Sequence, residues 1–258
     1  MNAVPVPSWR HRWLSLLDHI VAVPDEPRLE QLLKRLEAPE KPLILAFVNA
    51  HAMNSAARLP EFYSALLSSD LVLRDGSGMA TLYRMLGRDP GLNLNGTDLI
   101  PRIMAKYDGK RIALFGTRDE YANRARDSMA DDITPHSKID SVHGFHDMDI
   151  YIAMAIHQRP QLIVLGMGMP KQELLAVELR KAMKNTPCLI ICGGAIIDFL
   201  GGKTARAPEW VRKVGCEWVF RLALEPRRLF MRYVVGNPAF LMRAASLKRS
   251  ARSDSISS

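Results

Sequence analysis

Short apolar runs alternate with helical patterns along most of the chain, and this alternation constrains the fold more than any other feature. The runs are strand-sized and aliphatic, as in LILAFV (43–48), RIALFG (111–116) and LIVLG (162–166). The segments between them have helical periodicity. Apolar strands joined by helices form crossover connections, which produce a mostly parallel sheet with helices on both faces. We therefore expect an α/β, Rossmann-like fold.

The pattern and the charge both change after residue 202. No strand is expected between residues 208 and 247, only helical pieces broken at Gly215, Pro226 and 236–238. Residues 203–252 carry twelve Lys or Arg against three Glu, a net +9, so that the rest of the +8 chain sums to −1. The sequence therefore predicts a catalytic core (1–202), a basic helical appendage (203–252) and a disordered tail (253–258).

Aromatic residues are interleaved with the arginines of this appendage, which leaves two interpretations open. It is either a helical cap whose arginines lie in solvent, or a surface that meets anionic lipid headgroups and inserts its apolar face. Under the second interpretation Arg243, Lys248 and Arg249 are expected to contact lipid.

The start of the chain and its cysteines indicate a cytoplasmic protein. The first residues resemble no signal peptide, and the longest apolar runs are far shorter than the ~18 residues of a membrane span. The cysteines are Cys188, Cys192 and Cys216, without a CxxC pair. Such spacing favours reduced thiols over disulfides or a zinc site.

The stretch LGMGMPKQE (165–173) resembles a dinucleotide-binding turn but lacks its third glycine, because Lys171 occupies that position. A P-loop at residues 197–204 fails in the same way, with Ile197 in place of the first glycine. What remains is a strand, a glycine turn and a helix N-terminus that favours an anion. Gly168 and Gln172 are therefore candidate ligand-binding residues, although a glycine turn that only permits packing is the alternative.

Polar residues follow several predicted strands, at the edge where open α/β sheets bind ligands. Asp75 follows one strand and Asn49 another. Asp75 is a candidate general base, ribose ligand or helix N-cap, and Asn49 a candidate ligand or ordinary turn residue. Further candidates at strand-to-helix junctions are Thr97, Asp98 and Asp198, and Thr97 or Asp98 is expected to cap a helix.

Two patterns that resemble metal sites are assigned to other roles. Asp147 and Asp149 form a DxD, but they come just before a helix, whose dipole favours acids there. His143 and His146 lack a third ligand nearby in the sequence. We expect no metal site and no divalent metal cofactor.

The ordered motifs VNAHAMN, LRDGSGM, NGTDLIPRI, LFGTRDE, VHGF, LGMGMPKQE and the RAPEW…RRLFMRY tail resemble those of the WecG/TagA/CpsF glycosyltransferases (glycosyltransferase family 26). The resemblance covers residues 43–235. It implies a Rossmann-like, inverting hexosyltransferase that moves a sugar from a UDP-sugar to a polyprenyl-diphosphate-linked sugar. The implied place is the cytoplasmic membrane face, in bacterial cell-surface or extracellular polysaccharide synthesis.

The resemblance also implies roles for particular residues. Asp75 matches the family's proposed catalytic base, and Asn49 and Gln172 match polar residues of the substrate pocket. Arginines thought to reach the diphosphate correspond to Arg206, Arg221, Arg228 and Arg232. Two departures are Cys216, where an aliphatic residue is expected, and Ser77 beside Asp75, where it could alter which sugar is accepted.

The C-terminal GNPAFL stretch makes the exopolysaccharide glucosyltransferase (GumM-like) branch of the family a candidate beside the N-acetylmannosamine branch. The expected partners are thus a UDP-sugar, a polyprenyl-diphosphate-linked acceptor and an anionic membrane surface, with no nucleic acid. A nicotinamide oxidoreductase is the rival enzyme, although its glycine fingerprint is missing. A basic RNA-binding module is the rival outside catalysis. The transferred sugar and the oligomeric state stay open.

Overall fold

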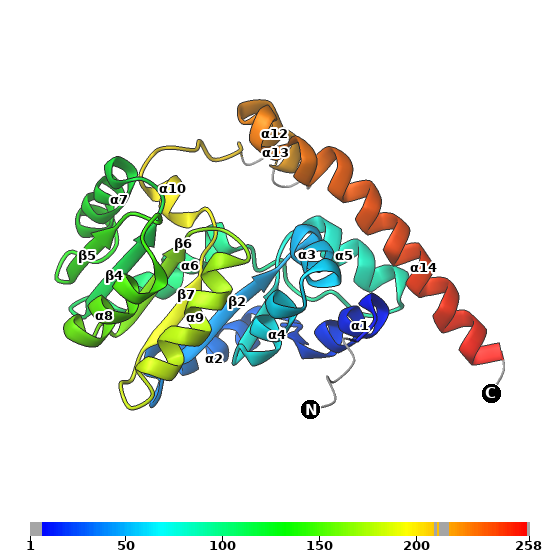
Figure 1. The fold of residues 1–258 in the computed structure, drawn as a ribbon, viewed down its shortest axis with the longest axis horizontal. Helices are drawn as coiled ribbons and strands as arrows, with labels where there is room; N and C mark the ends of the chain where they lie inside the picture. The colour runs from blue at the N-terminus through cyan, green and yellow to red at the C-terminus, as the bar shows by residue number, and fades with distance from the viewer. Residues whose placement is uncertain (1–6, 209–210, 212–216, 257–258) are drawn as a thin grey trace.

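The protein is built on one seven-stranded parallel sheet in the order β1-β3-β2-β7-β6-β4-β5 (Figure 1). The computed structural model describes residues 7–208, 211 and 217–256. The strands are β1 (Ile20–Val21), β2 (Leu43–Val48), β3 (Leu71–Arg74), β4 (Arg111–Gly116), β5 (Lys138–Val142), β6 (Leu162–Gly166) and β7 (Leu189–Cys192). The predicted α/β, Rossmann-like class is confirmed.

The two faces of the sheet bury alternate residues of each strand, as pleating requires. In β2, Ile44, Ala46 and Val48 enter one hydrophobic cluster and Leu45 and Phe47 enter the other. The edge strand β5 is only partly buried, but β2, β6 and β7 are covered on both faces and are therefore continuously apolar rather than alternating. The sequence runs that predicted these strands are therefore a direct result of burial on two sides.

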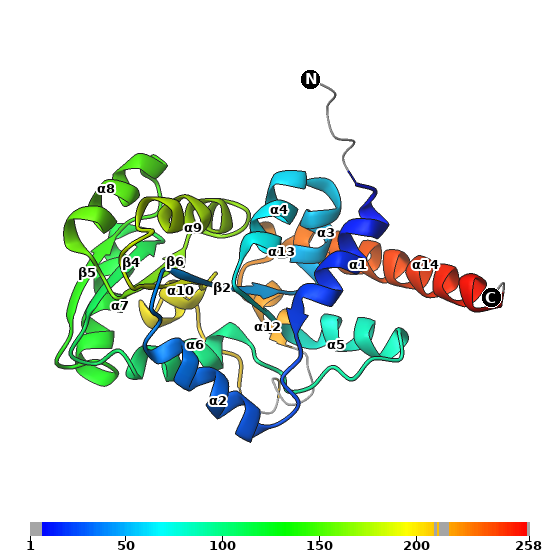
Figure 2. The same ribbon diagram turned by 90° about the horizontal axis from the view of Figure 1, so that it is seen from below.

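Helices cover both faces, and Figure 2 shows α4 and α9 on one side of the sheet and α2 and α6 on the other. The first layer contains α1 (Trp9–His19), α3 (Ala50–Arg58), α4 (Pro60–Ser68), α5 (Gly76–Met85), α8 (Met148–Gln158) and α9 (Lys171–Ala182). The second contains α2 (Glu26–Glu37), α6 (Gly96–Ala105), α7 (Asp119–Asp132) and α10 (Ile196–Leu200).

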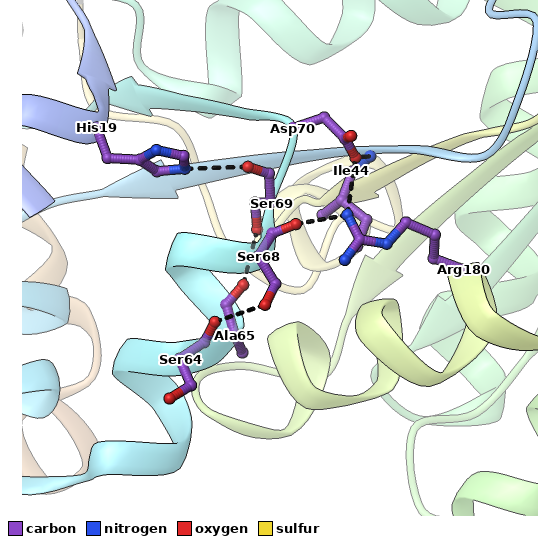
Figure 3. Close-up of polar contacts among 8 residues, drawn as sticks. All are labelled: His19, Ile44, Ser64, Ala65, Ser68, Ser69, Asp70 and Arg180. Carbon is purple, nitrogen blue, oxygen red and sulfur yellow. Dashed lines mark hydrogen bonds and ion pairs between the residues drawn. The ribbon is translucent and has the colours of Figure 1, made fainter. Parts of the chain in front are cut away.

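A polar network at the amino ends of the strands fixes α4 against α9 (Figure 3). Asp70 accepts a hydrogen bond from the backbone N–H of Ile44 at 2.9 Å and pairs with Arg180 at 3.1 Å. Arg180 also donates to the Ser68 carbonyl at the end of α4. This end of the sheet is thus closed by structural contacts, which leaves the carboxyl end for a ligand.

The C-terminal segment is helical, and its second half is continuous where a break was predicted. After α12 (Glu217–Leu224), the helix α13 (Pro226–Phe230), the π-helical turn η1 (Met231–Val235) and α14 (Gly236–Ile256) follow without a gap. Pro226 begins α13, as predicted. The predicted break at 236–238 is wrong. The wider π turn lies just before Pro238, where a proline would otherwise clash with the preceding helical turn.

The helix α14 packs on the core as well as extending beyond the sheet (Figure 1). Phe240 is buried and lies 5.4 Å from Trp13 of α1 between ring centroids. Ala244 and Leu247 join the same cluster, and Arg10 donates to Ser246 at 2.9 Å. The division at residue 202 stays a prediction, but the core of the first layer includes α14.

The tail expected from residue 253 is helical as far as Ile256. Across the part of the chain that the structure describes, no helix is both long and apolar enough to cross a bilayer.

Candidate active site

The carboxylate of Asp75 lies at the carboxyl end of β3, beside the end of β2. The Asn49 amide donates to Asp75 Oδ2 at 3.3 Å, while its oxygen accepts from the Ala52 N–H at 3.1 Å. Asn49 is therefore both the N-cap of α3 and a partner of the carboxylate. Asp75 occupies the N-cap position of α5 without a side-chain capping bond. Its carboxylate is thus not used to cap the helix.

Burial is the main influence on the charge state of Asp75. Burial raises the pKa of its carboxyl, while the Asn49 hydrogen bond and the charges of Arg232, Arg221 and Arg74 act in the opposite direction. Arg74 is itself held by the carbonyls of the loop that follows α5, at 2.8 Å from the Pro90 oxygen. A half-buried carboxylate with a raised pKa facing arginines is typical of a functional site.

Gln172 joins the two glycine turns that follow β6 and β7. Its side-chain oxygen accepts from the backbone N–H groups of Gly168 and Gly194, each at 3.2 Å. Its nitrogen donates to the buried Glu173 at 2.8 Å. Gly168 has a φ of +79°, which favours glycine. The Gln172 oxygen therefore holds the turns in place, and only its second N–H could reach a ligand.

Asp198 lies in the same region, but a neighbouring lysine balances its negative charge. Its carboxylate accepts from the Thr117 hydroxyl and pairs with Lys203 at 2.9 Å. Thr117 follows β4 and has a φ of 53°, an uncommon backbone conformation for threonine. Asp198 thus connects the carboxyl ends of β4 and β7 and holds Lys203 beside them.

The predicted caps of α6 are wrong, because the N-cap is Asn95, whose side chain accepts from the Asp98 N–H at 2.9 Å. Asp98 instead forms an ion pair with Arg206. Asp98 and Arg206 line neither of the two cavities that meet at Asp75, whereas Thr97 lines both. The structure therefore separates Asp98 and Arg206 from the other candidates.

Two cavities meet at Asp75. The glycine-turn chamber, of about 690 Å³, includes Gly168, Gly194, Thr117 and Asp198 in its wall. The apolar chamber, of about 810 Å³, lies against α5 and the C-terminal helices, with Trp218, Leu222, Tyr233, Val234, Phe240 and Leu241 in its wall. Both chambers are lined by Asn49, His51, Asp75, Thr97, Arg221 and Arg232.

The C-terminal helices bring two of the predicted arginines to this junction. Arg221 stacks over the Phe199 ring at 5.5 Å, and its Nε is buried without a hydrogen-bond partner among the described residues. Arg232 contributes to the electrostatics of Asp75 from η1. The side chain of Arg228 and the whole of Cys216 lie outside the described residues.

His51, Asn54 and Arg58 were not expected at the site, and Arg243 was expected to contact lipid, but all four line the glycine-turn chamber. His51 follows Asn49 by two residues on α3. Burial, with help from the Arg232 and Arg58 charges, lowers the pKa of its ring to about 4. The ring is therefore neutral at physiological pH. Only its place in the VNAHAMN motif could have drawn attention to it.

The acidic and histidine patterns that were set aside lie around α8. Asp147 is at the N-cap position of α8 and Asp149 is in its first turn. The rings of His143 and His146 stack at 3.9 Å. Among the described residues, no three His, Cys, Asp or Glu side chains gather as a metal site would require. Independence from metal stays a prediction.

A parallel sheet that presents a half-buried carboxylate to a cation-lined cleft at its carboxyl edge is the framework of a Rossmann-like enzyme for anionic substrates. Residues 17–254 match the model of the glycosyl transferase WecG/TagA/CpsF family. The chain belongs to this family, and it is a glycosyltransferase by that membership.

Two of the curated relatives carry the same name. A Bacillus subtilis (strain 168) protein called N-acetylglucosaminyldiphosphoundecaprenol N-acetyl-beta-D-mannosaminyltransferase is 23% identical over 189 residues, 72% of this chain and 73% of the relative. A protein of the same name from Staphylococcus aureus (strain NCTC 8325 / PS 47) is 24% identical over 211 residues, 80% of this chain and 81% of the relative.

Proposed function

We propose that this protein is an inverting hexosyltransferase that moves a sugar from a UDP-sugar to a polyprenyl-diphosphate-linked sugar. The observation that carries the proposal is the half-buried Asp75 carboxylate, held by Asn49 and faced by arginines where two chambers meet. The names of the relatives support a lipid-linked N-acetylglucosamine acceptor and an N-acetylmannosamine donor. Glucose is the alternative sugar.

The proposed reaction is a single displacement. The acceptor hydroxyl attacks the anomeric carbon as the bond from that carbon to the donor's phosphate oxygen breaks, and the electron pair leaves with UDP. Asp75 accepts the hydroxyl proton, so that no alkoxide has to form in advance. A raised pKa suits this role, because a carboxylate that is a stronger base takes the hydroxyl proton more readily.

The leaving diphosphate gains negative charge, which the site must stabilise. Arg221 and Arg232 lie at the junction of the chambers, and the Gly168 turn precedes the N-terminus of α9. Arginines and helix N-termini stabilise such charge through hydrogen bonds and dipoles. We propose that they support transfer without a divalent metal.

The two chambers suit the two substrates. Polar backbone at the glycine turns and the Thr117–Asp198–Lys203 cluster fit a nucleotide with its sugar and phosphates. The apolar chamber, with Trp218 and Phe240 in its wall, fits the lipid-linked acceptor. In this arrangement the acceptor hydroxyl and the donor carbon approach each other at Asp75.

Access to a lipid-linked substrate would come from the C-terminal helices. Phe230 is 51% exposed and Met242 is 68% exposed, and neither lines a chamber. Lys248 and Arg249 follow on α14. Exposed apolar side chains beside basic ones favour binding to an anionic membrane surface. We propose a peripheral position on the inner face of the cell membrane, in bacterial surface or extracellular polysaccharide synthesis.

The test is a UDP-release assay with UDP-N-acetylmannosamine, UDP-N-acetylglucosamine and UDP-glucose, using a short-chain polyprenyl-diphosphate N-acetylglucosamine acceptor. We expect acceptor-dependent release with one donor, and an α-linked donor sugar becoming β-linked in the product. Release that is equal without acceptor, or a product that retains the donor's anomeric configuration, would contradict the proposal. Bound nicotinamide in the absorbance spectrum of the purified protein would favour the oxidoreductase instead.

A further inference from the structure

The glycine-turn chamber carries more positive charge than its own carboxylates balance. Five cationic side chains among the described residues line it, namely Arg58, Lys203, Arg221, Arg232 and Arg243. Two carboxylates line it, Asp75 and Asp198. Asp198 is already paired with Lys203. Because cations in a concave site with low-dielectric walls repel one another, this excess is an electrostatic cost until an anion enters.

Two of these cations, Arg58 and Arg243, have not been assigned a role toward either substrate. Arg58 ends α3 and Arg243 lies on α14, and these two helices pack together. Asn54, one turn before Arg58, connects them, because its oxygen accepts from Arg243 at 2.7 Å and its nitrogen donates to the Gly236 carbonyl at 2.7 Å. Arg243 is thus held at the chamber wall.

This position is incompatible with the predicted role of Arg243 as a residue that contacts lipid headgroups. Its guanidinium is half-buried and bonded to Asn54, and burial and the charge of Arg58 lower its pKa. A surface cation that meets a membrane would lie free in solvent. Arg243 therefore faces the cleft, where its remaining N–H groups are available to a ligand.

Arg58 is the complementary half of the arrangement. Within the described part of the chain its side chain forms neither a hydrogen bond nor an ion pair, and it lines the chamber from an exposed position. It lies close enough to Arg243 and His51 to disfavour their protonation. An arginine that only repels its neighbours does not stabilise the folded protein. This indicates that the partner of Arg58 is a ligand.

We propose that Arg58 and Arg243, with Asn54 fixing the second, form a diphosphate-binding subsite in the glycine-turn chamber. Guanidinium groups bind phosphate oxygens with two parallel hydrogen bonds, and two guanidinium groups on facing helices suit an anion with two phosphates. The neutral His51 ring adjoins the subsite and can donate a hydrogen bond to the same anion. The subsite is separate from the predicted set of Arg206, Arg221, Arg228 and Arg232.

Under the proposed function a diphosphate occurs on both substrates, in the UDP donor and in the polyprenyl carrier. The choice between these sources rests on the proposed function, whereas the existence of the subsite does not. Inorganic pyrophosphate is therefore the first probe, since it contains the shared chemistry and neither nucleotide nor lipid.

The experiment measures pyrophosphate binding by calorimetry for the wild-type chain, Arg58→Gln and Arg243→Gln. Arg124→Gln on α7 is the matched control, because Arg124 pairs with Glu120 on the surface. We expect each cleft variant to weaken pyrophosphate binding about tenfold, the effect of a lost charged hydrogen bond, and the control to be unchanged. Unaltered affinity in both cleft variants, or no pyrophosphate binding by the wild-type chain, would overturn the subsite.

Thermal stability separates a ligand role from a structural one. Arg58→Gln removes like-charge repulsion and no intramolecular bond, so its melting temperature should stay the same or rise while affinity falls. A fall in melting temperature that parallels the fall in affinity would overturn the assignment of Arg58. Arg58→Lys keeps the charge but loses the paired donors, and we expect it to restore only part of the affinity.

A second arm identifies which diphosphate the subsite holds. Weaker UDP binding in Arg58→Gln, with unchanged uridine binding, would assign it to the donor. A raised acceptor KM with unchanged UDP affinity would assign it to the lipid carrier. If no UDP-sugar is a donor while pyrophosphate binding still depends on Arg58 and Arg243, the proposed function fails and the subsite stands.

Discussion

The Asn49 amide lies between a helix and a carboxylate, donating to Asp75 at 3.3 Å while its oxygen caps α3. Capping fixes which end of the amide faces Asp75, because only the nitrogen remains on that side. The ends of β2 and β3 are therefore joined through a polar contact at the reaction centre. A residue whose sequence position suggests an ordinary turn thus fixes the orientation of the proposed base.

Replacing Asp75 by Asn keeps the shape of the side chain and removes the base. We expect turnover to fall by about 10² or more, because general-base catalysis contributes roughly that much, while UDP affinity changes little. The assay is UDP release at saturating acceptor together with UDP calorimetry. Turnover close to that of the wild type would return Asp75 to a structural role.

Arg232 should influence the pH profile as well as the substrate affinity. Its charge opposes the rise in the pKa of Asp75, so that Arg232→Gln should raise that pKa further. The acid limb of kcat/KM against pH should therefore move to higher pH. Arg206→Gln is the control, since Arg206 pairs with Asp98 away from the cavity. A limb that moves equally in both variants would disprove the coupling.

Glu173 should make the fold less stable as the pH rises. Burial raises its pKa from 4.5 to about 7, so the folded chain holds a proton that the unfolded chain has lost between these values. The contribution of Glu173 to the free energy of unfolding is therefore fully present below pH ~4.5. It falls by on the order of 3 kcal/mol as the pH rises through ~7. Urea unfolding of Glu173→Gln should lack this decline relative to the wild type. Parallel stability curves would show that Glu173 is not the group responsible.

Transfer should not depend on a divalent metal. We expect full UDP release in excess EDTA and a mild effect of Asp149→Ala, because Asp147 and Asp149 lie at the start of α8 and outside both chamber walls. Loss of activity with EDTA and its recovery with Mg²⁺ or Mn²⁺ would instead show that the enzyme needs a divalent metal, for which Asp147 and Asp149 would be the candidate ligands.

Membrane binding should depend on the exposed side of the C-terminal helices. We expect Phe230→Ser combined with Met242→Ser to reduce co-sedimentation with anionic liposomes while release from a short-chain acceptor is retained. Ile156→Ser on α8 is the matched control, as Ile156 is 50% exposed on another element. Neutralising Lys248 and Arg249 should have a similar effect, larger at low salt. Equal sedimentation of all variants would exclude this surface.

The sequence was sufficient to predict the position of Asp75 and every strand except the two-residue β1. Burial on both faces makes the central strands continuously apolar, and parallel strands place the residues that follow them at one edge. The helix caps were harder, because Asn95, Thr97 and Asp98 are all acceptable caps and only the hydrogen bond to the Asp98 N–H distinguishes them.

Arg221 and Arg232 were expected on the basic side of the cleft, whereas the contribution of Arg58 and Arg243 could not be predicted, for a different reason. Arg58 and Arg243 are far apart in the sequence and look like ordinary surface residues within their helices. Their proximity depends on how α14 packs against α3, which no local pattern encodes. The engagement of Gln172 with Gly168 and Gly194 likewise depends on two turns meeting in space.

The order of strands has a consequence for biosynthesis. The central strand β7 pairs with β2 on one side and β6 on the other, and Ile44 of β2 lies opposite Ile190. A growing polypeptide emerges from the ribosome with β2 long before β7, so the middle of the sheet is incomplete until late in translation. Arg221, Arg232 and Arg243 emerge later still. The cleft is therefore complete only once the final part of the polypeptide has been made, and a fragment from a ribosome that stalls earlier lacks these three arginines.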